Sequence, residues 1–351
     1  MSGLRQLVFK SGLDALHLVG AHRWMPPPAK GRGAIFMLHH VRPWRGEAFA
    51  PNRHLEVTPE FLDRTIARVR ERGFDLVTMD EAHRRIGAAE EGSPFAAFTL
   101  DDGYRDNALH AVPVFQRHGC PYTIYVASDF AEGRGVLWWV VLAEAIRRLA
   151  AAEAVLGGIP RRYETADARA KGRAFAAIYA DLLRDGEPSR HPAIADLARQ
   201  AGFAPQAPCR ELCMTWPELA ALGADPLATF GAHTRSHPML AKLPAVDARA
   251  EILEGRTVLE RTLGRRIEHF AYPVGNAAAA GPREFAMVRE LGFRTGVTTR
   301  RGLVHGAHAA RAECLPRVSL NGHFQALRYV DLFLSGAPFA LADRLRPADA
   351  A

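Results

Sequence analysis

The sequence alternates between short apolar runs and longer segments in which apolar residues recur every three or four positions. Runs rich in β-branched and aromatic residues predict strands, and the longer spacing predicts helices. Eight runs fit the strand pattern: 34–38, 75–79, 95–100, 122–127, 227–230, 269–272, 294–298 and 315–320. Four clear helical patterns lie between them, at 59–72, 105–118, 245–263 and 282–291. This alternation indicates an α/β protein with a mainly parallel sheet.

The helix expected at 59–72 carries local signals at both ends. Thr58 can cap its N-terminus, Pro59 suits the first helical position, and Gly73 ends the run. Seven or eight strands separated by such helices favour a barrel or a doubly wound sheet. In both architectures, functional groups gather beyond the carboxyl ends of the strands.

The region 131–215 is different, because it is rich in Ala, Arg and Leu, has helical spacing and contains no convincing strand. We interpret it as a helical insertion that divides the strand-rich part of the chain into 31–130 and 216–322. An N-terminal helical extension is expected at 1–30, and a C-terminal helix and tail at 323–351. Extended disorder is expected only in the Ala-, Pro- and Arg-rich tail.

An insertion between two strands emerges at one end of a barrel, where it can cover the site. Trp138 and Trp139, near its start, are therefore candidate substrate contacts. The alternative, held at about even weight, is that both tryptophans only anchor the inserted helices.

Composition narrows the class of protein. The 351 residues are 48% hydrophobic and 24% charged, which predicts a globular fold with a substantial core. The formal charge of +7 comes from scattered arginines, and no basic stretch is interleaved with aromatic residues, so nucleic-acid binding is not expected. Of four cysteines, only Cys209 and Cys213 lie close together, which favours reduced thiols over a disulfide framework.

The first twenty residues lack the pattern of a secretory signal, because Arg5, Lys10 and Asp14 interrupt their apolar content. The longest apolar run, 136–143, has eight residues, well short of the roughly 20 that cross a bilayer. A cytoplasmic location is therefore expected. The expected first helix has an apolar face made of Leu4, Leu7, Val8, Leu16 and Val19. This face suits packing on the protein body, which we favour over peripheral contact with a membrane. Nothing in the sequence indicates an oligomeric state.

Two adjacent carboxylates follow one of the expected strands, in the segment Phe98-Thr99-Leu100-Asp101-Asp102-Gly103-Tyr104. Neighbouring negative charges raise each other's pKa unless a cation lies close by. The pair makes sense if one carboxylate binds a metal ion and the other acts as a base. Ordinary turn chemistry is the alternative for this motif taken alone.

Two histidines follow another strand, in Gly231-Ala232-His233-Thr234-Arg235-Ser236-His237-Pro238. At a spacing of four, both imidazoles would project from one face of a helical turn and reach a single ion. With Asp102 they would supply three protein ligands and leave a position for water, as in catalytic metal sites. Alone, such a pair is more often structural or exposed.

Together these segments resemble the first two motifs of the polysaccharide deacetylase family, the NodB-homology domain of carbohydrate esterase family four. The resemblance extends to Met37-Leu38-His39-His40-Val41, Thr58-Pro59-Glu60-Phe61, Phe270-Ala271-Tyr272-Pro273-Val274-Gly275 and Leu315-Pro316-Arg317-Val318. It covers about 33–130 and 216–320. It implies a deformed seven- or eight-stranded (β/α) barrel, a bound divalent ion and hydrolysis of acetamido groups on sugars.

By position, the resemblance implies that Asp101 is the catalytic base and that Asp102, His233 and His237 are the metal ligands. It further implies a backbone N–H near Val274 that stabilises the oxyanion. Zinc is the expected ion, with cobalt and nickel as alternatives. Side chains that flank these motifs are the expected substrate contacts: Tyr104, Tyr272 and Pro273, besides Trp138 and Trp139.

The chain departs from the family pattern at two positions. Ala271 stands where many members have an arginine that orients the catalytic aspartate, and Arg317 is a candidate substitute. No histidine follows the last strand at the usual position, so the general acid is unassigned. The candidates for the general acid are His39, His40, His305 and His323. Of these, His39 and His40 are best placed to act as the acid or to contact the substrate.

The leading hypothesis is an N-deacetylase that acts on N-acetylhexosamine units of a glycan or a lipid-linked glycan. Because of the two departures, a carbohydrate-binding protein that has lost catalysis is an alternative. A hydrolase of another carbon–nitrogen amide bond is a third possibility.

Overall fold

Seven parallel strands close into a barrel in the computed structural model, which describes residues 3–24, 31–89 and 92–344. Around the barrel the order is β1 (Gly33–Leu38), β12 (Leu315–Ser319), β11 (Thr295–Arg301), β10 (His269–Ala271), β9 (Ala228–Ala232), β6 (Tyr122–Val126) and β5 (Phe95–Leu100). Pairing between β5 and β1 closes it, and the short strand β4 (Asp75–Leu76) pairs with the first residues of β5. The expected α/β barrel is confirmed.

Successive side chains along the strands point alternately into the barrel and towards the surrounding helices, so the core has two layers. Ile35 pairs with Ala97, and both belong to the cluster inside the barrel, whereas Phe36 pairs with Phe98 and both belong to the cluster beneath the helices. Every residue of β1 and β5 is buried, as expected of parallel strands covered by helices.

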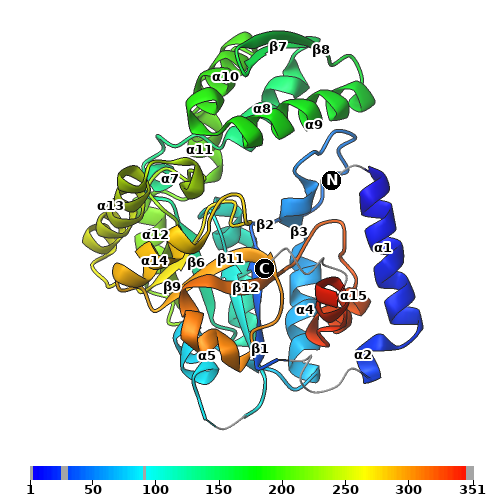
Figure 1. Cartoon of the computed structure of the whole chain (residues 1–351), viewed down its shortest axis with the longest axis vertical. Helices are drawn as coiled ribbons and strands as arrows, with labels where there is room; N and C mark the ends of the chain where they lie inside the picture. Colours follow the sequence, from blue (N-terminus) through cyan, green and yellow to red (C-terminus); the bar gives the residue numbers. More distant parts are fainter. Residues whose placement is uncertain (1–2, 25–30, 90–91, 345–351) are drawn as a thin grey trace.

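Helices α4 (Pro59–Glu71), α6 (Val112–His118), α12 (Trp216–Leu222), α13 (Ala245–Leu263) and α14 (Pro282–Glu290) follow strands around the barrel (Figure 1). The expected start of α4 is confirmed, since the Thr58 hydroxyl accepts a hydrogen bond from the Phe61 N–H at 3.2 Å. Short elements complete the barrel: β2 (His40–Val41), β3 (Glu56–Val57), α5 (Met79–Ile86) and α7 (Ser128–Ala131), with helical turns at Arg53–Leu55, Leu240–Lys242 and Gly306–Cys314.

Two expected elements differ in length. The strand expected at 75–79 stops at Leu76, because Thr78 caps α5 by accepting a hydrogen bond from the Glu81 N–H. The helix expected at 105–118 contains a π-helical turn, Asn107–Ala111, directly before α6. Such turns often mark functional sites, and this one adjoins the paired carboxylates.

The expectation of a strand-free insertion is wrong. Between helices α8 (Trp138–Arg148) and α9 (Ala168–Asp185), strands β7 (Ala151–Leu156) and β8 (Ile159–Glu164) form an antiparallel hairpin. Helices α10 (Glu187–Gln200) and α11 (Ala207–Leu212) follow, and the insertion has a hydrophobic cluster of its own. Figure 1 shows it, in green, standing over one end of the barrel.

Both ends of the described chain pack on the same side of the barrel. Helix α1 (Gly3–Leu18) buries Leu13, and its Asp14 accepts hydrogen bonds from Arg328 and from the Tyr329 hydroxyl, at 2.9 and 2.8 Å. Leu16 packs against the core, whereas Leu7 and Val8 are exposed. The packing of α1 on the body is thus partial.

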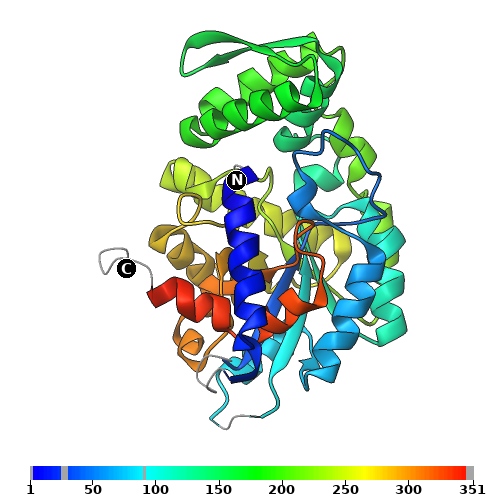
Figure 2. The same cartoon turned by 90° about the vertical axis from the view of Figure 1, so that its right-hand side faces the viewer.

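Helix α2 (Ala21–Trp24) follows α1, and the C-terminal part holds two helices rather than the single one expected, α15 (Leu327–Leu334) and α16 (Ala337–Arg344). Figure 2 shows α1 running beside them. The side chain of Leu4 and the tail at 345–351, for which disorder was expected, lie outside the described residues. None of the described helices combines the length and the apolar content that a membrane crossing requires. All four cysteines are free thiols, as expected.

Candidate active site

The three expected metal ligands meet at the carboxyl ends of β5 and β9. Oδ1 of Asp102 lies 3.5 Å from Nε2 of His233 and 3.3 Å from Nε2 of His237, and all three residues are buried. Two ligands about 2.0–2.2 Å from one ion in a tetrahedron are roughly 3.3–3.6 Å apart. The separations therefore fit a shared ion better than direct hydrogen bonds.

The surroundings of these atoms also fit a cation. Oδ1 of Asp102 is buried and has no hydrogen-bond partner. An unpaired carboxylate oxygen in this position is costly unless a positive charge completes it. Nδ1 of His233 lies 2.7 Å from the Ala271 carbonyl, which can only accept, so Nδ1 carries the proton and Nε2 presents its lone pair to the site. The residues thus suit a divalent ion.

The pKa values of the two imidazoles are shifted in opposite directions. Burial disfavours protonation of His233, but its contact with Asp102 and the nearby Asp101 outweigh this effect and raise its pKa. Burial lowers the pKa of His237 to about 3, so this side chain is neutral at neutral pH, the form that can bind a metal ion. The His237 ring packs against Phe130 and Trp139, with centroid distances of 5.5 and 5.0 Å.

The helical turn expected at 233–237 is wrong, because this segment is a loop in which Thr234 and His237 have φ of 66° and 65°. Helix α13 fixes the loop instead. The Glu251 carboxylate accepts hydrogen bonds from the Arg235 and Ser236 N–H groups and from the Ser236 hydroxyl, at 2.8–3.1 Å. Gly255 permits the close approach, since a Cβ there would lie 2.4 Å from the Thr234 backbone.

Asp101 faces Arg317 in a buried two-point ion pair. Nη1 and Nη2 of Arg317 donate to Oδ1 and Oδ2 of Asp101 at 2.7 and 2.6 Å. The guanidinium is itself held by the Thr298 carbonyl and the Thr99 hydroxyl, at 2.9 and 3.1 Å. Burial opposes ionisation of Asp101, but Arg317 outweighs it and lowers the pKa of this carboxyl. Arg317 lies within β12, and its head group reaches Asp101.

Backbone strain gathers around these residues. Non-glycine residues with positive φ among the described residues are Asp102, Thr234, His237 and Val274. For the β-branched Val274, a φ of 60° is a genuine outlier. Such strain persists where surrounding structure enforces it, and it clusters at active sites. In the described structure no hydrogen bond from the Val274 N–H is found, so this donor can serve a ligand.

The candidate acid residues are placed very differently. Nε2 of His39 lies 4.0 Å from Oδ2 of Asp101, and 18% of its side chain is exposed. His40 is buried, with Nδ1 2.6 Å from an Asp106 oxygen and its ring stacked on Tyr104. His305 lies beside Gly31 at the opposite end of the barrel.

His39 and His323 both act electrostatically on the same side chain, His54. Burial lowers the pKa of His54 to about 4, and the charges of His39 and His323 both add to this effect. Of the four histidines named from the sequence, His39 therefore combines nearness to the base with partial exposure.

All five expected substrate contacts are buried. Tyr272 donates its hydroxyl to the Glu313 carbonyl at 2.7 Å, and Pro273 is buried beside it. Tyr104 is fully buried, and burial raises the pKa of its hydroxyl. Trp138 and Trp139 belong to the core of the insertion, yet their indole N–H groups are buried without a hydrogen-bond partner. Trp139 is the tryptophan that reaches a candidate metal ligand, His237.

Sequence reasoning missed two residues of the insertion that support the site. Glu187 accepts a hydrogen bond from the Met239 N–H at 3.1 Å, two residues after His237, and pairs with Arg190. Arg190 is 1% exposed and lies over the Trp138 ring at 4.9 Å. No local motif could have revealed this contact, since the partners lie on separate segments of the chain.

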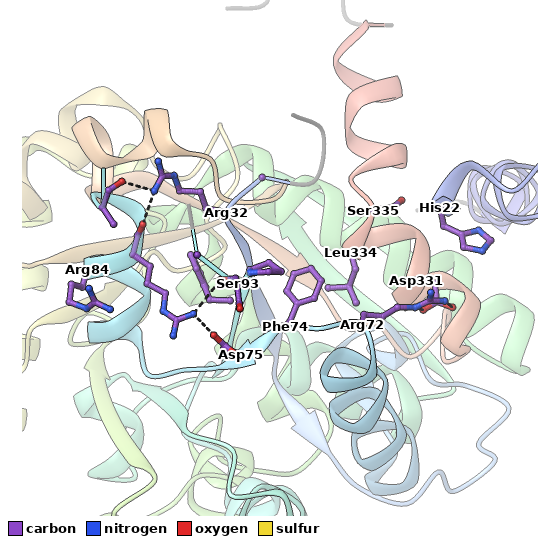
Figure 3. Close-up of a pocket in the computed structure, with 16 residues that line it drawn as sticks. His22, Arg32, Arg72, Phe74, Asp75, Arg84, Ser93, Asp331, Leu334 and Ser335 are labelled. Atoms are coloured by element: carbon purple, nitrogen blue, oxygen red, sulfur yellow. Dashed lines mark hydrogen bonds and ion pairs between the residues drawn. The ribbon is translucent and has the colours of Figure 1, made fainter. Parts of the chain in front are cut away.

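A cavity of about 780 Å³ lies at the other end of the barrel, next to the first residues of β1, β4 and β5 (Figure 3). Its arginines already have partners. For example, Arg72 contacts Asp331 and Arg85 contacts Asp75, at 2.8 and 2.6 Å. Catalytic groups of such barrels lie at the carboxyl ends of the strands, so this cavity is not the candidate active site.

Comparisons with known proteins agree with this fold. The sequence model of the family described as polysaccharide deacetylase matches residues 190–296, a stretch that includes His233 and His237. No match is found among curated protein sequences.

Solved deacetylases share the fold. The Streptococcus pyogenes deacetylase PplD in complex with acetate is 15% identical with a TM-score of 0.54, and the match covers 90% of this chain and 98% of that one. IcaB from Ammonifex degensii is 16% identical with a TM-score of 0.54, over 87% and 97% of the two chains. A polysaccharide deacetylase from Bacillus cereus is 14% identical with a TM-score of 0.53, over 86% and 68%.

The barrel and its candidate metal ligands define a protein of the deacetylase fold. Within this fold, residues 190–296 are similar to the polysaccharide deacetylase family.

Proposed function

We propose that this protein is a metal-dependent N-deacetylase that removes acetyl groups from N-acetylhexosamine units of a glycan or a lipid-linked glycan. The observation that carries the proposal is the buried Asp102, His233 and His237 group directly beside the Asp101–Arg317 pair. A structural metal site has no need of a second carboxylate held in a fixed orientation. A hydrolase needs both a place for an ion and a base.

Asp102, His233 and His237 would hold the ion, with zinc as the expected metal and cobalt or nickel as alternatives. A divalent ion in this position supplies Lewis-acid chemistry, which polarises a carbonyl and makes a water molecule more acidic. Asp101 is ionised at neutral pH and accepts the proton of the attacking water. General-base catalysis of this kind typically contributes roughly 10²–10⁴ in rate.

Other groups complete the reaction. Arg317 fixes the orientation of Asp101, and the Val274 N–H donates to the oxygen of the acetyl group as negative charge develops there. The leaving nitrogen needs a proton, and His39 is the histidine placed to provide it. Release of acetate and a free amino sugar then completes the cycle. A cytoplasmic location, with peripheral membrane contact if the sugar is lipid-linked, is part of the proposal.

Acetate release tests the proposal directly. The purified full-length protein loaded with zinc, cobalt or nickel is incubated with N-acetylglucosamine oligomers, and acetate and free amines are measured. We expect turnover that Asp101→Asn abolishes while the variant retains its metal. A wild-type protein that binds metal yet releases no acetate from a broad panel of N-acetylated glycans would contradict the proposed activity.

A further inference from the structure

A second cavity, of about 380 Å³, lies between the insertion and the loop that follows β2. We propose that this cavity is a saccharide-binding subsite, which holds the sugars next to the N-acetylated unit at the metal centre. The inference rests on the proposed function for the identity of the neighbouring sugar. Its volume falls within the roughly 300–1,000 Å³ typical of small-ligand sites, so it suits a short saccharide rather than a folded partner.

One face of α8 forms a wall of this cavity. The residues of α8 that line it recur three or four positions apart, as a single helical face requires: Trp139, Val140, Ala143, Glu144, Arg147 and Arg148. The opposite wall is the barrel loop, which is tied to α8 because the Asn52 side-chain amide donates to the Trp139 carbonyl at 3.0 Å. The insertion and the barrel therefore build this cavity together.

Aromatic rings and guanidinium groups share the lining. Trp44 is 40% exposed, with Arg53 over its ring at 4.0 Å, and Phe203 is half-buried, with Arg148 over its ring at 4.7 Å. A sugar ring has an apolar C–H face and a polar rim of hydroxyl groups. Aromatic surfaces beside fixed polar groups match both parts of such a ligand.

The charges of the lining favour a neutral ligand over an anion. Four arginines and four glutamates line the cavity, and most of them pair with one another. Arg42 contacts Glu56 at 2.7 Å, and Arg148 contacts Glu144 at 2.6 Å. Such pairs hold both donors and acceptors in place for hydroxyl groups, which need both. A site for phosphate or carboxylate would instead show an excess of unpaired cations.

Two side chains that line the cavity lie next to the proposed active site. Trp139 lines it and lies 5.0 Å, ring centroid to ring centroid, from the metal-ligand candidate His237. His40 also lines it and follows His39, which lies 4.0 Å from Asp101. A glycan whose acetamido group is at the metal centre would therefore have its neighbouring sugars next to this cavity.

Binding can be measured without turnover. The full-length Asp101→Asn protein is titrated with N-acetylglucosamine and its oligomers of two to six units, and the tryptophan fluorescence is followed. We expect affinity to rise with oligomer length and Trp44→Phe to reduce the signal. Phe203→Ala should weaken binding of the longer oligomers about five- to tenfold, the loss expected for one aromatic contact, and leave the monosaccharide unaffected.

Kinetics on the protein with Asp101 intact provide a second readout. Arg148→Ala should raise KM for the oligomers and leave kcat unchanged. Arg249→Ala is the matched control, because its side chain on α13 is 46% exposed, against 48% for Arg148, and it lies outside the cavity.

The two proposals fail in different ways. Oligomers that bind no more tightly than the monosaccharide, or that bind Phe203→Ala and Arg148→Ala as well as the unaltered cavity, would overturn the subsite even if acetate is released. Length-dependent binding that Phe203→Ala weakens, without any acetate release, would leave the subsite standing and count against the deacetylase.

Discussion

Arg317 and Asp101 meet in a buried ion pair with two contacts of 2.7 and 2.6 Å, although 216 positions separate them in the sequence. The pair joins the carboxyl end of β5 to the middle of β12, and these two strands flank β1 in the barrel. A buried carboxylate without this partner would take up a proton more easily and lose its ability to act as a base. The pair therefore links the closure of the barrel to the ionisation of the proposed base.

Removing the guanidinium should change the pH dependence of catalysis. Arg317 lowers the pKa of Asp101 against the effect of burial, so Arg317→Met should raise this pKa. The ionised base is present above its pKa, and the acidic limb of kcat/KM should accordingly move to higher pH. At neutral pH we expect a loss of roughly 10²-fold from the mispositioned base. Profiles of kcat/KM against pH measure both effects, and an unmoved acidic limb would argue against this role of Arg317.

The same pair should show strong coupling in stability. Arg317→Met leaves a buried carboxylate without its partner, which typically costs about 3–5 kcal/mol. Asp101→Asn in the Arg317→Met background removes the unpaired charge and should recover part of this loss. Urea unfolding of the two single variants and the double variant gives the coupling free energy. Simple additivity of the two substitutions would mean that the ion pair contributes little.

Removal of metal should destabilise the protein and leave its fold intact. Chelation at neutral pH is expected to lower Tm, because an ion that binds only the folded state stabilises it by mass action. His233→Ala should abolish both the bound metal and the effect of chelation on Tm, whereas Asp101→Asn should keep both. Elemental analysis and thermal unfolding are the measurements. A wild-type Tm that does not respond to chelator or to added zinc would contradict the proposed site.

Val274 offers a test that separates a backbone role from a side-chain role. A β-branched residue at φ of 60° is strained, so Val274→Gly should stabilise the fold by about 1 kcal/mol. Because glycine keeps the N–H, kcat should remain within about twofold of wild type if only the backbone stabilises the oxyanion. Thermal unfolding and steady-state kinetics check the two parts. A large loss of kcat in a folded Val274→Gly protein would assign the function to the side chain.

Local patterns in the sequence predicted the barrel strands because each is short, apolar and followed by a helix signal. The ends of these strands carry the Asp101-Asp102 and His233-to-His237 segments, and the topology brings them together. The hairpin of the insertion was missed although its turn, Gly157-Gly158, is a signal for a two-residue loop. The flanking strands are rich in alanine and charged residues, so their composition favoured helix.

Other features depend on tertiary contacts that no local pattern contains. The 233–237 loop follows helical spacing in sequence, but Glu251 and Gly255 of α13 hold it in a different conformation. Similarly, the substrate role expected of Tyr272 rested on its position in a motif. Its hydroxyl is instead used by the Glu313 carbonyl, on a segment far along the chain.

Glu187 should support metal binding from outside the ligand set. Its carboxylate holds the Met239 N–H and pairs with the buried Arg190, and so fixes the chain that follows His237. Glu187→Ala removes the acceptor and should weaken metal affinity about 10- to 100-fold, the usual effect of losing an outer-shell partner. Glu187→Gln keeps an acceptor oxygen and should lose less, while Glu254→Ala, which removes only a surface contact with Arg235, is the control. Competition with a chromophoric chelator measures the three affinities. Equal affinities for Glu187→Ala and Glu254→Ala would show that the insertion does not tune the metal centre through this contact.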